Sequence, residues 1–143
     1  MRKITLAEEQ VKYTALPAAF LTEDQGSADR FVVVHEAKVI GYFKIYRDFS
    51  NQLQPCESHA IGLRKFAIDK GQQGKGLGKE TVIALARELP RYYPKDDWLY
   101  LTVNCKNVVA YQCYLKAGFE DTNTFYLAGP NGPQHIMRHP LVN

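Results

Sequence analysis

The chain has 143 residues, of which 45% are hydrophobic and 23% are charged, as in an ordinary globular protein. This length predicts one domain with a single core, spanning residues 1–143. The net charge is only +3, and no apolar run approaches the roughly 20 residues of a membrane-spanning helix, so we expect neither a nucleic-acid-binding nor a membrane protein. The N-terminus lacks the apolar core of a signal peptide, and the cysteines Cys56, Cys105 and Cys113 form no CxxC pair. We therefore expect a cytoplasmic protein with reduced thiols and no metal site.

The first half of the chain predicts mainly strands. Residues 4–13 fit a short strand or a short helix, and residues 17–25 fit a short helix. Two β-branched and aromatic runs, 31–34 and 39–46, flank a four-residue turn and predict an antiparallel hairpin. The polar residues 47–57 then predict a loop, and residues 59–68 predict the next strand.

The second half alternates helices and strands. The helix after a glycine-rich segment has an apolar face made by Val82, Leu85, Ala86 and Leu89, and Pro90 is predicted to end it. A run that is apolar on both faces, 98–103, predicts a central strand. A helix over 107–117 should end at Gly118, and two final strands, 119–128 and 134–139, should pair across a turn at 129–133. A strand–helix–strand unit flanked by antiparallel strands predicts a mixed sheet with helices on its faces.

The glycine-rich segment, residues 70–81, is typical of a backbone that a ligand approaches closely. It fits neither a P-loop, because Leu77 stands where lysine is needed, nor a dinucleotide fingerprint, because Lys79 replaces the third glycine. Gly74, Gly76 and Gly78 nevertheless expose the unpaired N–H groups of a helix start, where the helix dipole favours an anion. A tight turn against the next strand would be the purely structural interpretation; we favour a phosphate site.

Two stretches together resemble the GCN5-related N-acetyltransferases (GNAT). The glycine-rich segment matches the family's pyrophosphate loop, Q/R-x-x-G-x-G/A, and a later stretch matches an asparagine followed by a helix that ends in Tyr-x-x-x-Gly-Phe. One helix and one strand separate the two stretches, as in the family. The matching residues are Gln73, Gly74, Lys75, Gly76, Leu77 and Gly78 in the first stretch, and Asn107, Ala110, Tyr114, Gly118 and Phe119 in the second.

The resemblance implies a fold of the α/β (mixed α+β) class. Its central mixed sheet is mostly antiparallel, with one splayed parallel strand pair and helices on both faces. The resemblance also implies transfer of an acetyl group from acetyl-CoA, as co-substrate, to a primary amine by direct attack in a ternary complex. A bulge in the strand before the glycine loop is expected to open the splay. The implied coenzyme-binding residues are Phe66, Ala67 and Ile68 along the pantetheine arm, Gln73 to Lys79 around the pyrophosphate (Gln73, Gly74, Lys75, Gly76, Leu77, Gly78, Lys79), and Asn107 and Tyr114.

The resemblance assigns Tyr114 as the general acid for the departing thiolate, and Tyr111 is the weaker candidate. A core tyrosine with no catalytic role is the alternative interpretation of Tyr114. The glutamate that many members carry on the strand before the glycine loop is missing, so the base stays open between Glu57, His59 and ordered water. Arg64 on that strand is a candidate for binding an acidic part of the acceptor or of the coenzyme.

The acceptor is expected to be a small-molecule or peptide amine, and its identity stays open. The oligomeric state stays open between a monomer and the homodimer that the family often forms. The missing glutamate motivates an alternative function, a catalytically weak GNAT-fold module that binds coenzyme A or another anion. A basic nucleic-acid binder would rest only on the charge of +3.

Overall fold

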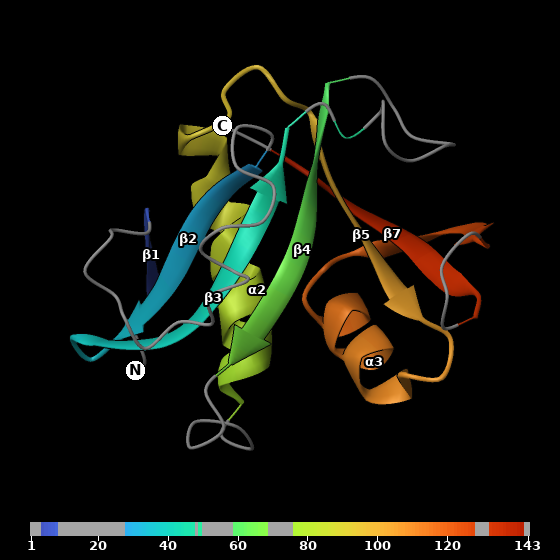
Figure 1. Ribbon diagram of the computed structural model, residues 1–143, viewed down its shortest axis with the longest axis horizontal. Helices are drawn as coiled ribbons and strands as arrows, with labels where there is room; N and C mark the ends of the chain where they lie inside the picture. Colours follow the sequence, from blue (N-terminus) through green and yellow to red (C-terminus); the bar gives the residue numbers. More distant parts are fainter. Residues whose placement is uncertain are drawn as a thin grey trace.

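The computed structural model describes residues 4–8, 28–47, 49, 59–68, 76–127 and 132–141. Its strands form one seven-stranded sheet in the order β1-β2-β3-β4-β5-β7-β6 (Figure 1). Every neighbouring pair is antiparallel except β4 with β5. The strands are β1 (Ile4–Glu8), β2 (Ala28–His35), β3 (Lys38–Tyr46), β4 (Ala60–Ile68), β5 (Trp98–Asn104), β6 (Glu120–Tyr126) and β7 (Gln134–Pro140). The predicted mixed, mostly antiparallel sheet with one parallel pair is confirmed.

The predicted hairpin is the pair β2–β3, and its turn is shorter than expected. Only Glu36 and Ala37 separate the strands, and both have positive φ, 51° and 64°. Two consecutive residues with positive φ are the signature of a type I′ turn, whose twist matches that of the flanking strands. The strands could therefore extend into the region that the sequence predicted as turn.

Two helices lie in the described part, α2 (Leu77–Glu88) and α3 (Val108–Lys116), with a 3₁₀ turn, η3 (Leu89–Arg91), directly after α2. Helix α2 begins at Leu77, inside the glycine-rich segment, and Pro90 lies in η3 as the predicted terminator. The buried residues of α2 are Leu77, Thr81, Val82, Ala84 and Leu85. Ala86, which the sequence assigned to the apolar face, is only half-buried. Gly118 follows α3 with φ 106°, which confirms it as the residue that ends this helix.

Strands β4 and β5 pair only where they begin. Their parallel ladder joins Ala60–Gly62 to Trp98–Tyr100, although β4 continues to Ile68 and β5 to Asn104. Beyond this ladder the two strands diverge, as Figure 1 shows. The expected bulge is also present, because the register between β3 and β4 shifts between the pairs Tyr42–Ala67 and Lys44–Arg64. The splayed pair that the resemblance implied is therefore confirmed.

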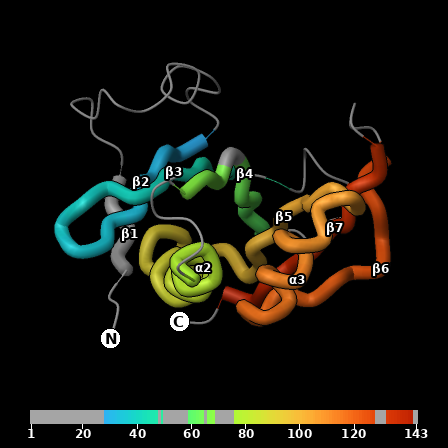
Figure 2. The backbone as a smooth tube through the Cα atoms, turned by 90° about the horizontal axis from the view of Figure 1, so that it is seen from below, coloured from blue at the N-terminus to red at the C-terminus, as the bar shows by residue number. Residues whose placement is uncertain are grey.

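The two faces of the sheet carry different clusters. The larger core cluster takes in Phe43, Leu63 and Leu101 from the strands, Leu85 from α2 and partly buried Tyr114 from α3. Both described helices thus cover this face, which we call the helix face, and Figure 2 shows them on the same side of the sheet. The opposite face carries a smaller aromatic cluster: Tyr46, Phe49, Ala60, Tyr100 and Ile136, with Ala28, Trp98 and Tyr126 against it.

No described helix covers the opposite face, so the prediction of helices there stays open. The predictions made on residues 9–27 and 50–58, and on 128–131 of the final turn, lie outside the described residues. Within the residues described, no helix is long and apolar enough to cross a membrane.

Candidate active site

The start of α2 depends on the conformation of Gly76. Gly76 is the N-cap residue, with φ 76° and ψ 5°, and no side chain caps the helix. A residue with a Cβ would be strained in this left-handed conformation, so glycine is favoured here. The chain can then enter the helix without a side chain in front of its first turn.

The first turn of α2 presents unpaired backbone N–H groups to its surroundings. Leu77, Gly78 and Lys79 precede the first intrahelical hydrogen bond, which Glu80 donates to the Gly76 carbonyl over 3.3 Å. A Cβ on Gly78 would meet no atom within 4 Å, so the space beside this turn is open. The Leu77 side chain is buried and anchors the turn to the core. Of the predicted pyrophosphate residues, Gln73, Gly74 and Lys75 lie outside the described part.

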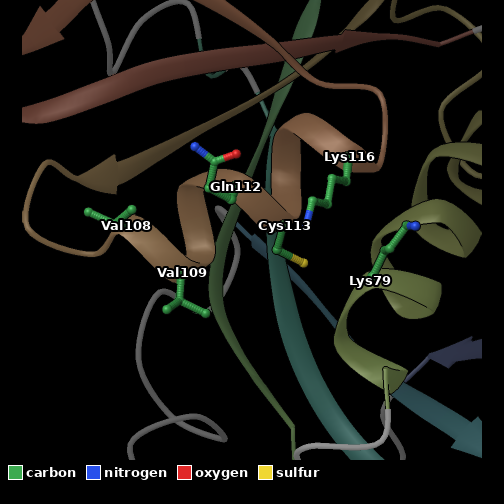
Figure 3. A pocket seen from close by; sticks show the side chains of 6 residues that line it. All are labelled: Lys79, Val108, Val109, Gln112, Cys113 and Lys116. Carbon is green, nitrogen blue, oxygen red and sulfur yellow. The ribbon is translucent and has the colours of Figure 1, made fainter.

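An open cavity of about 430 Å³ lies between the start of α2 and one side of α3. Figure 3 shows the Cys113 thiol pointing from α3 toward the side of α2 that carries Lys79, with Lys116 beside it. The cavity is lined by Lys79, Val108, Val109, Gln112, Cys113 and Lys116. Apolar walls with two ammonium groups at the edge suit a ligand that combines apolar and phosphate parts.

The residues that α3 contributes to this cavity were not identified from the sequence. Val108 and Val109 are 60% and 84% exposed, which is unusual for two consecutive valines, and this exposure cannot be read from the sequence. Cys113 is half-buried and lines the cavity. Burial raises the pKa of its thiol, while Lys79 and Lys116 pull the pKa in the opposite direction. The thiol is thus kept protonated beside two cations.

The three residues predicted to follow the pantetheine arm lie at the end of β4, beyond its ladder with β5. Phe66 packs against the core cluster of the helix face, and Ala67 and Ile68 are half-buried. On their other side Ala67 and Ile68 pair with Tyr42 and Gly41 of β3. This segment therefore runs along the splay, where the ladder with β5 has ended.

Asn107 is the N-cap residue of α3 and not a residue of the helix itself. Its side-chain oxygen accepts a hydrogen bond from the Ala110 N–H over 3.1 Å, and its backbone carbonyl accepts one from Tyr111. Capping uses the Oδ1 acceptor only and leaves the side-chain NH₂ group as a donor. The exposed Asn107 can thus cap α3 and donate to a ligand at the same time.

Tyr114 lies on the side of α3 that packs against the sheet. Its ring centroid is 5.6 Å from that of Phe119, and it joins the core cluster of the helix face. Burial raises the pKa of its hydroxyl to about 12, and Cys113 adds to the increase. The phenol therefore stays protonated throughout the physiological pH range. Within the part of the chain that the structure describes, no side chain is hydrogen-bonded to this hydroxyl.

Tyr111, the weaker candidate, has its hydroxyl engaged elsewhere. It donates a hydrogen bond of 2.7 Å to Asp121 on β6, and this bond raises the pKa of Tyr111. The imidazole of His135 lies against the Tyr111 ring in a tilted arrangement with centroids 4.4 Å apart, and its Nδ1 is 3.5 Å from the Asp121 carboxylate. This cluster fastens α3 to the sheet, which favours Tyr114 over Tyr111 as the proton donor.

Of the two candidate bases, Glu57 and His59, the structure describes only His59. Glu57 lies outside the described residues. His59 is exposed, has φ 58°, and its carbonyl accepts a hydrogen bond from the Asp97 N–H just before β4 and β5 begin to pair. It thus lies at the closed end of the splay, with its side chain toward solvent.

Comparison with known proteins agrees with this geometry. The chain is 27% identical to an uncharacterized N-acetyltransferase, YbbJ, from Bacillus subtilis (strain 168), over 99% of this chain and 89% of the relative. A spermine/spermidine N(1)-acetyltransferase of the same organism is 33% identical over 60% of this chain and 55% of the relative. A solved structure of AAC(6')-Ib in complex with Parmomycin and acetyl-CoA has a TM-score of 0.64 and 26% identity, over 88% of this chain and 69% of that one.

The model of the Acetyltransferase (GNAT) family matches residues 2–119, which is most of the chain. The match includes β4, the start of α2 and all of α3, the elements from which the site is built. The chain therefore belongs to the GNAT family of N-acetyltransferases, which are acyltransferases.

Proposed function

We propose that the protein transfers the acetyl group of acetyl-CoA to a primary amine, by direct attack within a ternary complex. The observation that carries this proposal is the opening between β4 and β5 beyond Gly62 and Tyr100, with the glycine-capped start of α2 and Tyr114 of α3 on the helix face. Such an opening admits an extended thioester between two strands, while the helix start binds its phosphates.

Each part of the coenzyme has a matching part of the site. The N–H groups of the first turn of α2, with the loop Gln73–Lys79, would bind the pyrophosphate. The cavity lined by Val109 and Lys116 would take apolar and phosphate parts of the nucleotide. The end of β4, Phe66 to Ile68, would follow the pantetheine arm, and the Asn107 amide would donate a hydrogen bond to it.

In the proposed reaction the amine nitrogen attacks the thioester carbonyl carbon, and the carbon–sulfur bond then breaks. A backbone N–H of the bulged β4 would stabilise the developing oxyanion. The sulfur leaves as a thiolate, whose thiol form has an ordinary pKa of about 8.5. The Tyr114 hydroxyl, whose pKa is about 12, would donate a hydrogen bond to this thiolate. Because the phenol keeps its proton more strongly than a thiol does, Tyr114 acts mainly as a strong hydrogen-bond donor to the developing thiolate.

The amine must lose a proton before it attacks, because a free alkylamine has a pKa of about 10. Glu57 and His59 remain candidates for accepting this proton, and ordered water is the third. The relatives named for spermine, spermidine and aminoglycosides support an amine acceptor, since all of these are amines. The cytoplasm remains the proposed compartment, and Cys105 and Cys113 are free thiols, which fits it. The homodimer that the family often forms remains a prediction.

The substitution Tyr114→Phe tests the central role. It should lower kcat by roughly 10²- to 10³-fold, the usual range for removing one positioned hydrogen-bond donor, with little change in the affinity for acetyl-CoA. Steady-state kinetics on an amine panel and calorimetry with acetyl-CoA measure the two effects. The matched control is Tyr111→Phe on the same helix, which removes only the hydroxyl bonded to Asp121 and should retain most of kcat. Turnover of Tyr114→Phe at the wild-type rate would remove Tyr114 from the mechanism.

The same amine panel tests the activity itself. If acetyl-CoA binds to the wild-type protein but no amine in a broad panel is acetylated, the protein is the catalytically weak coenzyme-binding module. That alternative is motivated by the missing strand glutamate, since Gly62, Arg64 and Lys65 occupy the corresponding part of β4.

A further inference from the structure

Three cationic side chains lie next to one another on the face of the sheet opposite the helices. Lys44 of β3 is the register partner of Arg30 on β2 and of Arg64 on β4. Directly paired residues share a face, so the three side chains form a row across β2, β3 and β4. Lys44 is fully buried within this row. Like charges directly opposite one another are unfavourable unless each of them is compensated by a partner.

Arg64 is the member of this row nearest to the splay. It follows Gly62, the last β4 residue of the ladder with β5, by two positions, or about 7 Å along the strand. Its guanidinium carbon lies 5.5 Å from the ring centroid of Tyr46 and 5.6 Å from that of Phe49. The Phe49 ring in turn packs on Gly62, where an added Cβ would be 2.1 Å from it. Two aromatic rings therefore fix the guanidinium beside the point where the strands separate.

Arg64 differs from its neighbours in its partners. Arg30 and Lys44 have interactions of their own. Arg138, on the same face, stacks on Trp98 at 4.0 Å and donates a 2.6 Å hydrogen bond to Glu120. Among the residues the structure describes, by contrast, no carboxylate is paired with the half-buried Arg64. A planar guanidinium held in this way is suited to a carboxylate, which it binds through two parallel hydrogen bonds.

The position of Arg64 indicates whether it binds the coenzyme or the acceptor. The parts assigned to the coenzyme, namely the first turn of α2, the cavity against α3 and Tyr114, lie on the helix face. Among the described residues, no part of the site assigned to the coenzyme lies on the opposite face at the splay, so we assign this face to the acceptor. The geometry therefore points to Arg64 as the binding site for a carboxylate of the acceptor, so that the substrate is an amine that also carries a carboxylate, such as an amino acid or a peptide. This inference rests on the proposed function. It also sets the chain apart from the relatives named for polycationic amines, which the Arg64 guanidinium would repel.

Matched acceptors that differ only in the carboxylate test the inference. Phenylalanine, phenylalaninamide and phenethylamine share a primary amine, as do lysine and its decarboxylated form, cadaverine. The wild-type protein should acetylate the carboxylate-bearing member of each set with the higher kcat/KM. Arg64→Met, which keeps the aliphatic volume, should lower kcat/KM for that member by roughly 10- to 100-fold, as expected for a charged hydrogen bond. It should leave the carboxylate-free amines and the Kd of acetyl-CoA unchanged.

Two further variants serve as controls for the charge and for the position of Arg64. Arg64→Lys keeps the charge without the two-pronged geometry and should restore only part of the preference. Arg91→Met, an exposed arginine in η3, removes the same charge away from this face and should behave as wild type. Thermal unfolding of Arg64→Met checks that the sheet is intact.

The results separate the failure of this inference from that of the proposed function. If no amine is acetylated although acetyl-CoA binds, the proposed function fails, and binding of N-acetylphenylalanine to the protein saturated with coenzyme A then decides the role of Arg64. Weaker binding of this probe to Arg64→Met than to Arg91→Met supports a carboxylate site. The inference is overturned if spermidine or kanamycin is preferred over every carboxylate-bearing amine. It is equally overturned if Arg64→Met weakens acetyl-CoA alone, because Arg64 would then bind the coenzyme, or if the probe binds both variants equally.

Discussion

The hydroxyl of Tyr114 shows how burial changes the chemistry of one residue. In water a phenol has a pKa of about 10, close enough to a thiol for proton exchange. Burial against Phe119 and the sheet raises the pKa of Tyr114 to about 12. The protein thus keeps this proton available as a hydrogen-bond donor throughout the physiological pH range.

The raised pKa of Tyr114 predicts a loss of stability in alkali. Below pH 10 the tyrosine is protonated in both the folded and the unfolded chain. Between pH 10 and about 12 the unfolded chain loses the proton while the folded chain keeps it, so the free energy of unfolding falls as the pH rises. The slope for one group reaches at most about 1.4 kcal/mol per pH unit. Urea unfolding at several pH values between 9 and 11.5 measures it.

Tyr114→Phe is the reference for this measurement, because it lacks the titrating group and keeps the other tyrosines. Wild type should lose more stability than the variant over that pH interval. Parallel curves for the two proteins would show that the pKa of Tyr114 is not raised. The raised pKa of Tyr111, which its bond to Asp121 causes, is common to both proteins and cancels in the comparison.

Asn107 and Tyr114 stand out in the sequence as candidate site residues because both belong to a motif of fixed spacing. The contacts around them could not be predicted in the same way. Asn107 caps α3 with its side-chain oxygen only because the helix begins directly after it. Asp121 accepts the hydrogen bond of the Tyr111 hydroxyl only because β6 lies beside α3. Contacts between residues distant in sequence leave no local pattern, which is why Val109 and Lys116 were also missed as cavity residues.

At the scale of elements, the start of α2 separates two roles of glycine. Gly76 has a positive φ that other residues adopt only with strain, whereas Gly78 lies within the helix with open space around it. Glycine in a helix costs up to about 1 kcal/mol relative to alanine, so nothing in the fold itself explains Gly78. Access of a phosphate to the N–H groups of the first turn would explain it.

Substitutions of Gly76 and Gly78 by alanine are therefore expected to have different effects on stability. Gly76→Ala should destabilise the protein by about 1–2 kcal/mol, because alanine is strained in the left-handed conformation. Gly78→Ala should leave stability unchanged or raise it by up to about 1 kcal/mol, yet weaken acetyl-CoA binding. Urea unfolding and calorimetry measure the two quantities on the same samples. Wild-type affinity of Gly78→Ala for acetyl-CoA would contradict a role of this turn in binding the coenzyme.

Most elements followed from local pattern. The runs at 31–34 and 39–46, the strand over 98–103 and the helix ended by Gly118 are all present. The boundaries that differed are those set by neighbours: α2 extends back to Leu77 because this side chain is buried in the core, and the turn after β2 shortens to Glu36 and Ala37. The bulge in β4 was expected only from the family resemblance, and the shifted register with β3 confirms it.

At the scale of the whole molecule, the sheet consists of two parts joined at a short seam. The parts are β1–β4 with α2 and β5–β7 with α3, and only the ladder Ala60–Gly62 to Trp98–Tyr100 joins their strands. A coenzyme in the splay would contact both parts, through the first turn of α2 and through α3. It should therefore stabilise the folded protein as a whole.

Acetyl-CoA should raise the free energy of unfolding by roughly 2.7 kcal/mol when its concentration is a hundred times its Kd. Thermal unfolding should then shift upward by several degrees in a concentration-dependent manner. Pantetheine, which lacks the pyrophosphate and the nucleotide, should stabilise less at the same concentration. An equal shift with both ligands would mean that the start of α2 and the cavity beside α3 contribute no binding energy.

The sequence by itself determined the strand and helix periods, the glycine-rich helix start and the two motifs that resemble the family, because each is encoded in residues close together along the chain. Only the tertiary structure decided that Arg64 is held between Tyr46 and Phe49 beside the splay and on the face away from Tyr114, because that arrangement depends on the register of strands distant in sequence. The proposed donor site thus follows from local motifs, whereas the proposed acceptor site follows from strand pairing.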